Sequence, residues 1–211
     1  MNVLSVFDGM SCGRIALERA GITVTKYYAS EIDKHAIKIA KLRWPDIVHI
    51  GDVRRVVPSM LPFFHLLIGG SPCQGFSFAG KRLNLKDPRS KLVFKYAWLL
   101  KKLKAINPDI KFLLENVRMD SRSEGVITDL MGVQPIMINS ALVSAQNRER
   151  LYWTNIGPGY FDLVGTRVSE IPQPKDRGIL LKDIIENGAV DREKSYCIDA
   201  NYMKGGAWRI T

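Results

Sequence analysis

One cysteine stands in a setting that favours nucleophilic chemistry. Cys73 lies in the run GGSPCQG at residues 69–75, directly after an apolar segment that we expect to be a buried strand. A free cysteine is most often a small core residue, but the proline, the glycines and the polar loop around Cys73 argue against burial. Lys81, Arg82 and Arg89 follow in that loop, and nearby positive charge favours the thiolate form that a nucleophile needs.

Acidic residues follow three successive apolar runs. Asp8 comes after the first run, Glu31 after the second and Asp52 after the third. At the carboxyl ends of parallel strands, Glu31 is expected to bind ribose hydroxyls, and Asp52 is placed to accept from an adenine amino group. Each acid alone is more often a cap or a solvated turn, but three together predict a nucleoside-binding crevice. The residues expected to line it are Phe7, Asp8, Gly9, Ser11, Cys12, Gly13, Glu31, Ile32, Asp52, Val53 and Pro72.

Two later segments supply further candidate groups. Glu115 follows the apolar run 110–114, so its carboxylate is expected to face the same crevice. The run QNRER at residues 146–150 leads into a late strand, where Gln146, Arg148 and Arg150 would share one face. A solvated, charged strand edge is the equally weighted alternative for this run.

The elements that must position these groups alternate between strands and helices. Short β-branched runs separated by segments of helical period predict an α/β fold with a doubly wound, mostly parallel sheet. Residues 1–156 are expected to form the cofactor-binding and catalytic domain, and residues 157–211 the start of a target-recognition region. The expected strands are 3–7, 24–29, 47–50, 65–68, 110–114, 136–139 and 151–154, and the expected helices are 14–20, 34–43, 92–106 and 180–186.

Composition narrows the class of partner. The 211 residues carry a formal net charge of +10, which favours a polyanionic partner because each neutralised phosphate releases counterions. Three widely separated cysteines predict neither a disulfide framework nor a metal site. No apolar run approaches the roughly 20 residues of a membrane span, and the first residues lack the pattern of a signal peptide. We therefore expect a cytoplasmic protein with no membrane partner.

These residues, taken together, resemble the DNA cytosine-C5 methyltransferases. The resemblance rests on Pro-Cys-Gln at 72–74, Glu-Asn-Val at 115–117 and Gln-x-Arg-x-Arg at 146–150, in the order of the family. Asp-Pro-Arg at 87–89 and Gly-Asp-Val at 51–53 also fit. The Phe-Asp-Gly turn at 7–9 is similar to that of the animal de novo enzymes.

The resemblance implies a Rossmann-like methyltransferase fold and a mechanism. Cys73 would attack C6 of a cytosine flipped out of double-stranded DNA, with S-adenosylmethionine as methyl donor and S-adenosylhomocysteine as product. Glu115 would assist at N3, and Arg150, with Arg148, would contact O2, where negative charge develops. The residues expected to contact DNA are Gln74, Ser77, Lys81, Arg82, Arg89 and Gln146.

Two features of the sequence depart from the family pattern. Many bacterial members have a Phe-x-Gly-x-Gly-Gly turn, whereas this chain has Ser11 and Cys12 there and its next glycine at Gly13. It has no clear match to the two C-terminal motifs, so we expect a further C-terminal segment or a second chain. Without it, one side of the first strand–helix unit is expected to expose apolar surface, including part of segment 3–7 or the helix 14–20. Positive charge on Lys81, Arg82, Lys86, Arg89 and Arg148 should gather on one face and give DNA binding that weakens with salt.

Three other functions compete with DNA methylation. A tRNA cytosine-C5 methyltransferase shares every motif. A non-catalytic methyltransferase-like partner protein would be expected to lose Cys73 or Glu115, and both are present. A nicotinamide-dependent oxidoreductase fits the fold but leaves the Pro-Cys-Gln run unexplained.

Overall fold

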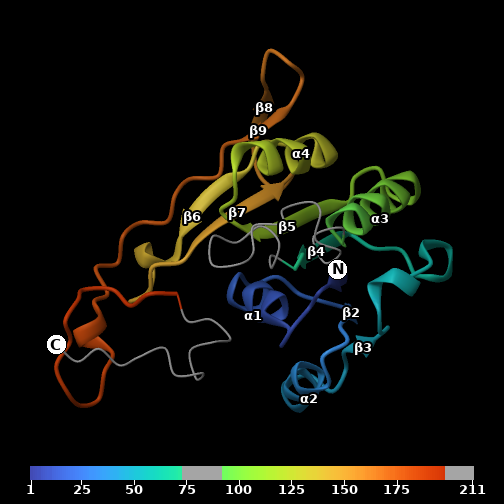
Figure 1. The fold of residues 1–211 in the computed structure, drawn as a ribbon. Helices are drawn as coiled ribbons and strands as arrows, with labels where there is room; N and C mark the ends of the chain where they lie inside the picture. The colour runs from blue at the N-terminus through green and yellow to red at the C-terminus, as the bar shows by residue number, and fades with distance from the viewer. Residues whose placement is uncertain (73–91, 198–211) are drawn as a thin grey trace. The chain divides into compact units, whose positions relative to one another are not determined.

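A computed structural model describes residues 1–72 and 92–197 of the chain (Figure 1). The chain divides into two compact units. The first comprises Met1–Ile136 and Leu151–Ile171, and the second Met137–Arg150 and Pro172–Thr211. The division at residue 157 into a catalytic domain and a target-recognition region concerns function and stays a prediction.

A seven-stranded sheet of order β3-β2-β1-β4-β5-β7-β6 organises the fold. The pairs β1–β2, β2–β3, β1–β4 and β4–β5 are all parallel. The strand order reverses direction between β1 and β4, so a crevice is expected beyond their carboxyl ends. The strands are β1 (Asn2–Val6), β2 (Lys26–Ser30), β3 (Val48–His49), β4 (Leu66–Gly70), β5 (Lys111–Val117), β6 (Ile136–Asn139) and β7 (Glu149–Thr154).

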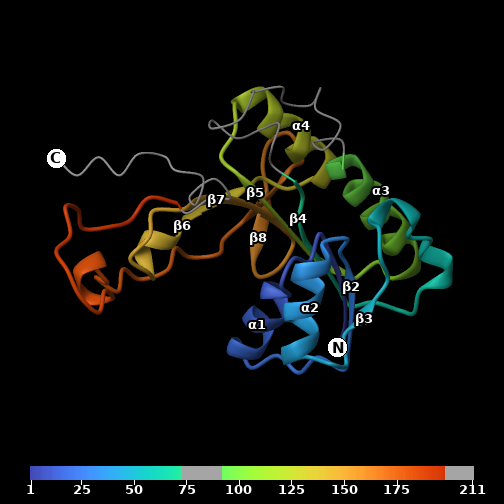
Figure 2. The ribbon, with the colours of Figure 1, turned by 60° about the horizontal axis from the view of Figure 1, so that its bottom comes forward.

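Helices cover both faces of the sheet in the first unit. Helices α1 (Cys12–Arg19) and α2 (Lys34–Arg43) lie on one face, and α3 (Leu92–Ile106) and α4 (Ser121–Met131) on the other (Figures 1 and 2). Alternate residues of each strand face opposite layers, because side chains in a strand have a period of two. Val3 thus packs with Leu17 of α1, whereas Leu4 belongs to the core formed with α3 and α4.

Local signals explain where the helices begin and end. The Asp33 side chain caps α2 by accepting from the backbone N–H groups of His35 and Ala36. The Asp120 side chain caps α4 by accepting from the Ser123 N–H, and the helix ends at Gly132, which adopts the left-handed conformation. No helix in the described part of the chain is long and apolar enough to cross a membrane.

The first strand–helix segment does not expose the apolar surface that we expected. Val3, Leu4 and Val6 are fully buried, and Leu17 of α1 is 8% exposed. The expectation was wrong because β1 is a central strand, flanked by β2 and β4 and covered on both faces.

The segment after residue 157 differs most from the expectation. It contains an antiparallel hairpin of β8 (Gly159–Phe161) and β9 (Arg167–Ser169), which the sequence did not predict. The predicted helix 180–186 is wrong, since only a 3-10 turn, Leu181–Asp183, forms there. The Leu181 N–H, at the start of this turn, donates to the Glu193 carbonyl.

A lysine holds the second unit together. The ammonium group of Lys194 donates to the carbonyl oxygens of Ala141, Ser144 and Ile179, at 2.8, 3.1 and 2.5 Å. These carbonyls come from segments about 40 residues apart in sequence, so one side chain links both parts of the unit.

Candidate active site

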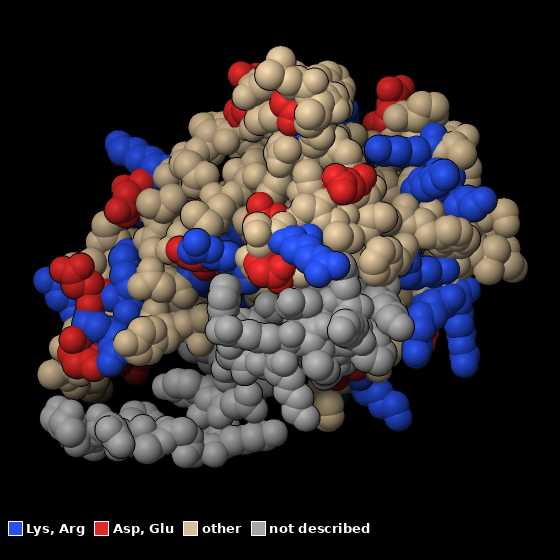
Figure 3. All heavy atoms as spheres, turned by 45° about the horizontal axis from the view of Figure 1, so that its top comes forward, with Lys and Arg blue, Asp and Glu red and all other residues tan. Residues whose placement is uncertain are grey.

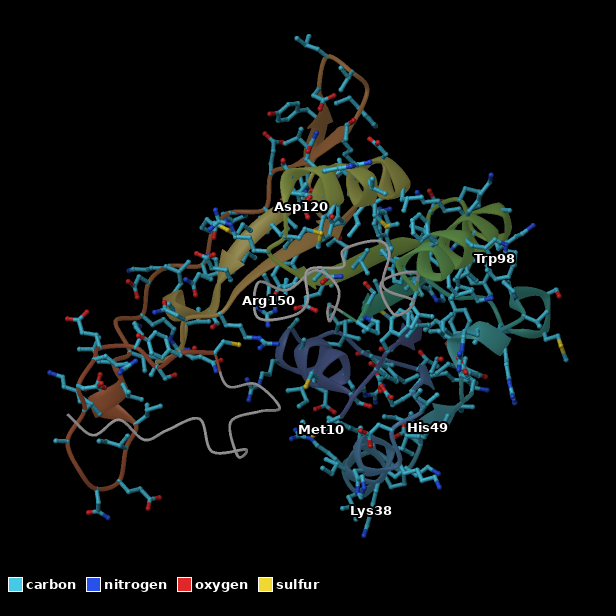
Figure 4. All side chains as sticks on the ribbon, viewed as in Figure 1. Met10, Lys38, His49, Trp98, Asp120 and Arg150 are labelled. Atoms are coloured by element: carbon cyan, nitrogen blue, oxygen red, sulfur yellow. The ribbon has the colours of Figure 1, made fainter. Side chains whose placement is uncertain are left out.

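The turn after β1 has a strained backbone. Phe7 and Ser11 have φ angles of 56° and 62°, in the left-handed region that non-glycine residues seldom adopt, and Gly9 between them has a φ of 58°. Such conformations cost on the order of 1–3 kcal/mol each and persist where the surrounding structure determines them. Met10, labelled in Figure 4 beside α1, is half exposed in this turn.

A buried carboxylate determines the shape of this turn. Asp8 is 9% exposed, and its two oxygens accept from the hydroxyls of Ser11 (2.5 Å) and Tyr27 (2.7 Å). Burial, and then the charge of Asp8, raise the pKa of Tyr27 well above its usual value, so this phenol stays a donor. Asp8 therefore stabilises the turn through Ser11 and links it to Tyr27 of β2. The sequence did not predict these two contacts.

The two glycines of the turn have different roles. A Cβ at Gly9 would meet no atom within 4 Å, so the backbone there is open to a ligand. Glycine is favoured at this position because the φ angle is positive. A Cβ at Gly13 would lie 2.3 Å from Ile68 Cδ1. Gly13 lets α1 approach the sheet closely, so packing explains this glycine without a ligand.

Glu31 lies beside Gly9 at the end of β2. One carboxylate oxygen accepts from the Gly9 N–H at 2.7 Å, and the other from the N–H groups of Ile32 and Asp33 at 2.7 and 2.9 Å. A carboxylate oxygen has two lone pairs, so the oxygen on Gly9 keeps one acceptor position for a ligand hydroxyl. The Ile32 side chain beside it is 67% exposed.

Asp52 follows β3 and is bound by its neighbour. Its carboxylate accepts from the backbone N–H and the guanidinium of Arg54, and these hydrogen bonds lower the pKa of Asp52. The Arg54 side chain is largely exposed, so it can give way to an incoming donor. The Val53 side chain is 5% exposed and packs in the core, and its place in the crevice stays a prediction.

These groups fit S-adenosylmethionine, which the fold implies. The Gly9 turn offers open backbone, the Glu31 carboxylate offers an acceptor for a ribose hydroxyl, and Asp52 offers one for an adenine amino group. A shallow hollow of about 370 Å³ on α2 includes none of these residues; it is lined by Lys34, Ile37, Lys38, Lys41 and Leu42. Among the described residues, no group of His, Cys, Asp and Glu could hold a metal ion.

The adjacent strand ends bring a second set of groups together. Gly70 of β4 pairs with Glu115 of β5 in the parallel register. A Cβ at Gly70 would lie 2.7 Å from Glu115 Oε2, so the carboxylate occupies the space that a side chain there would fill. Glu115 lies inside the strand, which we expected to end at Leu114.

A buried hydrogen bond joins the next two positions. Asn116 Nδ2 donates to Ser71 Oγ at 2.8 Å, and the two residues are 1% and 4% exposed. Asn116 Oδ1 accepts from the Val117 N–H. The Asn116 amide thus fixes the position of Ser71, the residue before Pro72. The spacing of the Glu-Asn-Val and Pro-Cys-Gln motifs did not predict this bond.

Several predicted residues lie outside the described part of the chain. Pro72, half buried, is the last residue before that gap in the description. The predicted nucleophile and the predicted DNA contacts that fall there are Cys73, Gln74, Ser77, Lys81, Arg82 and Arg89, with Lys86.

The remaining predicted residues belong to the second unit. Strand β7 begins at Glu149, so Gln146 and Arg148 precede it, contrary to the expectation of one continuous strand face. The guanidinium of Arg148 donates to Cys197 Sγ at 3.0 Å, and that of Arg150 lies 3.9 Å from the same sulfur. The two guanidinium groups therefore lie near the same sulfur, and their role in the site stays a prediction.

Comparisons with known proteins show the family of the chain. A family model of the C-5 cytosine-specific DNA methylases matches residues 1–208. The type II methyltransferase M.NgoBV of Neisseria gonorrhoeae is 33% identical over 207 residues, and the orphan methyltransferase M.SPRI of Bacillus phage SPR is 34% identical over 165 residues. These alignments cover 88% and 72% of this chain but 46% and 37% of the relatives, so the chain spans less than half of their length.

Solved structures match in fold. A mutant of DNMT2 from Spodoptera frugiperda has a TM-score of 0.65 at 21% identity, covering 90% of this chain and 60% of that one. The Dnmt2 methyltransferase of S. pombe has a TM-score of 0.55 at 18% identity, covering 73% and 48%. The sheet order and these matches define a Rossmann-like methyltransferase fold. Within that class, the chain belongs to the C-5 cytosine-specific DNA methylase family.

Proposed function

We propose that the protein containing this chain transfers a methyl group to C5 of cytosine in double-stranded DNA. The observation that carries the proposal is the pairing of β4 with β5. It brings Glu115 beside Gly70, three residues before Cys73, and Asn116 against Ser71, two residues before it. An acid and a nucleophile-bearing segment thus start from one edge of the sheet.

The proposed chemistry uses the Cys73 thiolate as nucleophile and Glu115 as acid. Cytosine C5 is a poor nucleophile, and addition of the Cys73 thiolate to C6, with a proton at N3 supplied by Glu115, raises its electron density. S-adenosylmethionine, bound at the Gly9 turn and Glu31, supplies the methyl group and leaves as S-adenosylhomocysteine. Loss of the C5 proton to a base then expels the Cys73 thiolate, and return of the N3 proton to Glu115 restores the neutral ring.

Arginines of the second unit are proposed to stabilise the negative charge that develops on the base. Arg150, with Arg148, is proposed to contact O2 of the flipped cytosine. Gln146 and the basic residues between 73 and 91 are proposed to contact the DNA. The bacterial and phage relatives support a cytoplasmic location for the protein.

Positive surface supports a polyanionic substrate. Lys101, Lys102 and Lys104 are exposed on α3, and Figure 3 shows basic side chains gathered on this side of the first unit. Long-range attraction between such charges and phosphates raises association rates and weakens with added salt.

A substrate panel tests the proposal. Cytosine-containing duplex DNA and unmodified tRNA are each incubated with the full protein and labelled S-adenosylmethionine. Label on C5 of DNA cytosine, absent in Cys73→Ala and strongly reduced in Glu115→Gln, is the expected result. Label on tRNA alone would overturn the assignment to DNA, and transfer by Cys73→Ala at the wild-type rate would overturn the mechanism.

A further inference from the structure

Gly70 differs from the neighbouring glycines in what it accommodates. Its φ lies outside the left-handed region, so the backbone does not require glycine at this position. Gly69, one residue earlier, is confined by backbone and core, since a Cβ there would lie 2.8 Å from the Val6 carbonyl oxygen and 3.1 Å from Tyr96. At Gly70 the atom within 3 Å is the carboxylate oxygen of Glu115.

Parallel pairing explains this contact. Paired residues of neighbouring strands carry their side chains on the same face, and Gly70 and Glu115 are paired. Because position 70 has no side chain, the Glu115 carboxylate can lie back over β4. The space above Gly70 is therefore part of what selects the conformation of Glu115.

We propose that Gly70 is a positioning residue: the missing side chain at position 70 holds the Glu115 carboxylate over the end of β4, towards the segment that carries Cys73. This inference rests on the proposed function, because it assigns a partner to the proposed acid. According to this inference, the position of the Glu115 carboxylate depends on the free space over β4 as well as on the backbone of β5.

The substitution Gly70→Ala tests the positioning role without disturbing the fold. The atom that a Cβ would displace is the far end of a flexible side chain, so Gly70→Ala can be accommodated by moving the carboxylate alone. The substituted protein should keep the wild-type melting temperature and the wild-type affinity for S-adenosylmethionine. Its KM for DNA should be unchanged, while kcat should fall on the order of 10–100-fold, since a displaced acid loses much of a general acid's contribution.

A double-mutant cycle tests whether Gly70→Ala slows the reaction through Glu115. If Gly70 acts through Glu115, then adding Gly70→Ala to Glu115→Gln should change the single-turnover rate by less than about twofold. An equal loss in both backgrounds would overturn the inference, because the alanine would then act on the nucleophile segment instead. Gly125→Ala is the matched control, since a Cβ there meets no atom within 4 Å in α4; it should leave kcat unchanged.

A crystal structure of the Gly70→Ala protein gives a readout independent of turnover. The expected result is a Glu115 carboxylate that has left the space over residue 70, with β4 and β5 in their original register. A carboxylate that remains there would overturn the inference. Failure of the proposed function is distinguishable, because it would appear as wild-type turnover in Glu115→Gln.

Discussion

Asn116 Nδ2 donates a hydrogen bond of 2.8 Å to Ser71 Oγ, and both residues are buried. The bond joins β5, immediately after Glu115, to the residue before Pro72. It therefore fixes the start of the segment that carries Cys73 relative to the proposed acid. Leaving such a group unsatisfied in a buried site costs about 1–3 kcal/mol.

We therefore expect Asn116→Ala to lower the free energy of unfolding by about 1–3 kcal/mol and to slow methyl transfer while S-adenosylmethionine binding stays intact. Urea unfolding and single-turnover rates would measure the two effects. Ser71→Ala should show a smaller loss of stability, because Asn116 Nδ2 still lies 3.4 Å from the Ser71 carbonyl oxygen. An Asn116→Ala protein with wild-type stability and rate would contradict this account of the bond.

Glu31 should contribute to cofactor binding in two ways. Its carboxylate holds the Gly9 N–H and keeps an acceptor position for a ribose hydroxyl. Glu31→Ala should weaken S-adenosylmethionine binding by about 1–3 kcal/mol, or roughly 5- to 150-fold in Kd. Calorimetry would measure this, with the exposed Glu186→Ala as control, and an unchanged affinity in Glu31→Ala would refute the placement.

The buried Tyr27 predicts a loss of stability in alkali. Burial, and then the charge of Asp8, raise the pKa of Tyr27 above the ordinary tyrosine value of about 10. In the unfolded chain the phenol ionises near pH 10, whereas in the folded protein it stays protonated, so the unfolded state is favoured as pH rises above 10. The stabilising contribution is fully present below that pH.

Tyr27→Phe should therefore reduce the fall in the free energy of unfolding between pH 8 and pH 10.5. Tyr160→Phe, at a residue that is 55% exposed, is the control and should leave the fall as in wild type. At pH 8 the Tyr27→Phe protein should be less stable by about 1–3 kcal/mol, because Asp8 loses a buried donor. An identical alkaline slope in Tyr27→Phe would show that this phenol does not cause it.

Lys194 should stabilise the second unit in particular. Lys194→Ala leaves the carbonyls of Ala141, Ser144 and Ile179 without their charged donor. Amide hydrogen exchange should become faster at Asn147 and Ser195, whose N–H groups bond within this unit, and stay unchanged in β1 and β4. The exposed Lys182→Ala is the control, and equal protection in both variants would contradict the role given to Lys194.

Elements with strong local signals were predicted well from the sequence. The helices 34–43 and 92–106 match α2 and α3, because apolar periodicity and the following prolines, Pro45 and Pro108, mark them. The predicted helix at 180–186 was wrong because a short apolar run is a weak helix signal, and only the 3-10 turn Leu181–Asp183 forms there.

The site was predictable as a set of strand ends, but its internal contacts were not. Glu31 and Glu115 were predicted as site residues because acids follow apolar runs at the carboxyl edge of a parallel sheet. The bonds of Asp8 to Tyr27 and of Asn116 to Ser71 join residues 19 and 45 positions apart, and they depend on register. The role of Gly70 follows from a paired side chain on the next strand, which no local pattern reveals.

Covalent trapping tests the central claim most directly. The full protein is incubated with S-adenosylmethionine and duplex DNA containing 5-fluorocytosine, which lacks the C5 proton whose loss releases the enzyme. A protein–DNA adduct should survive denaturation, map to a peptide containing Cys73, and be absent in Cys73→Ala. Methylation of ordinary cytosine by the wild type with no such adduct, or an adduct on another residue, would contradict the account.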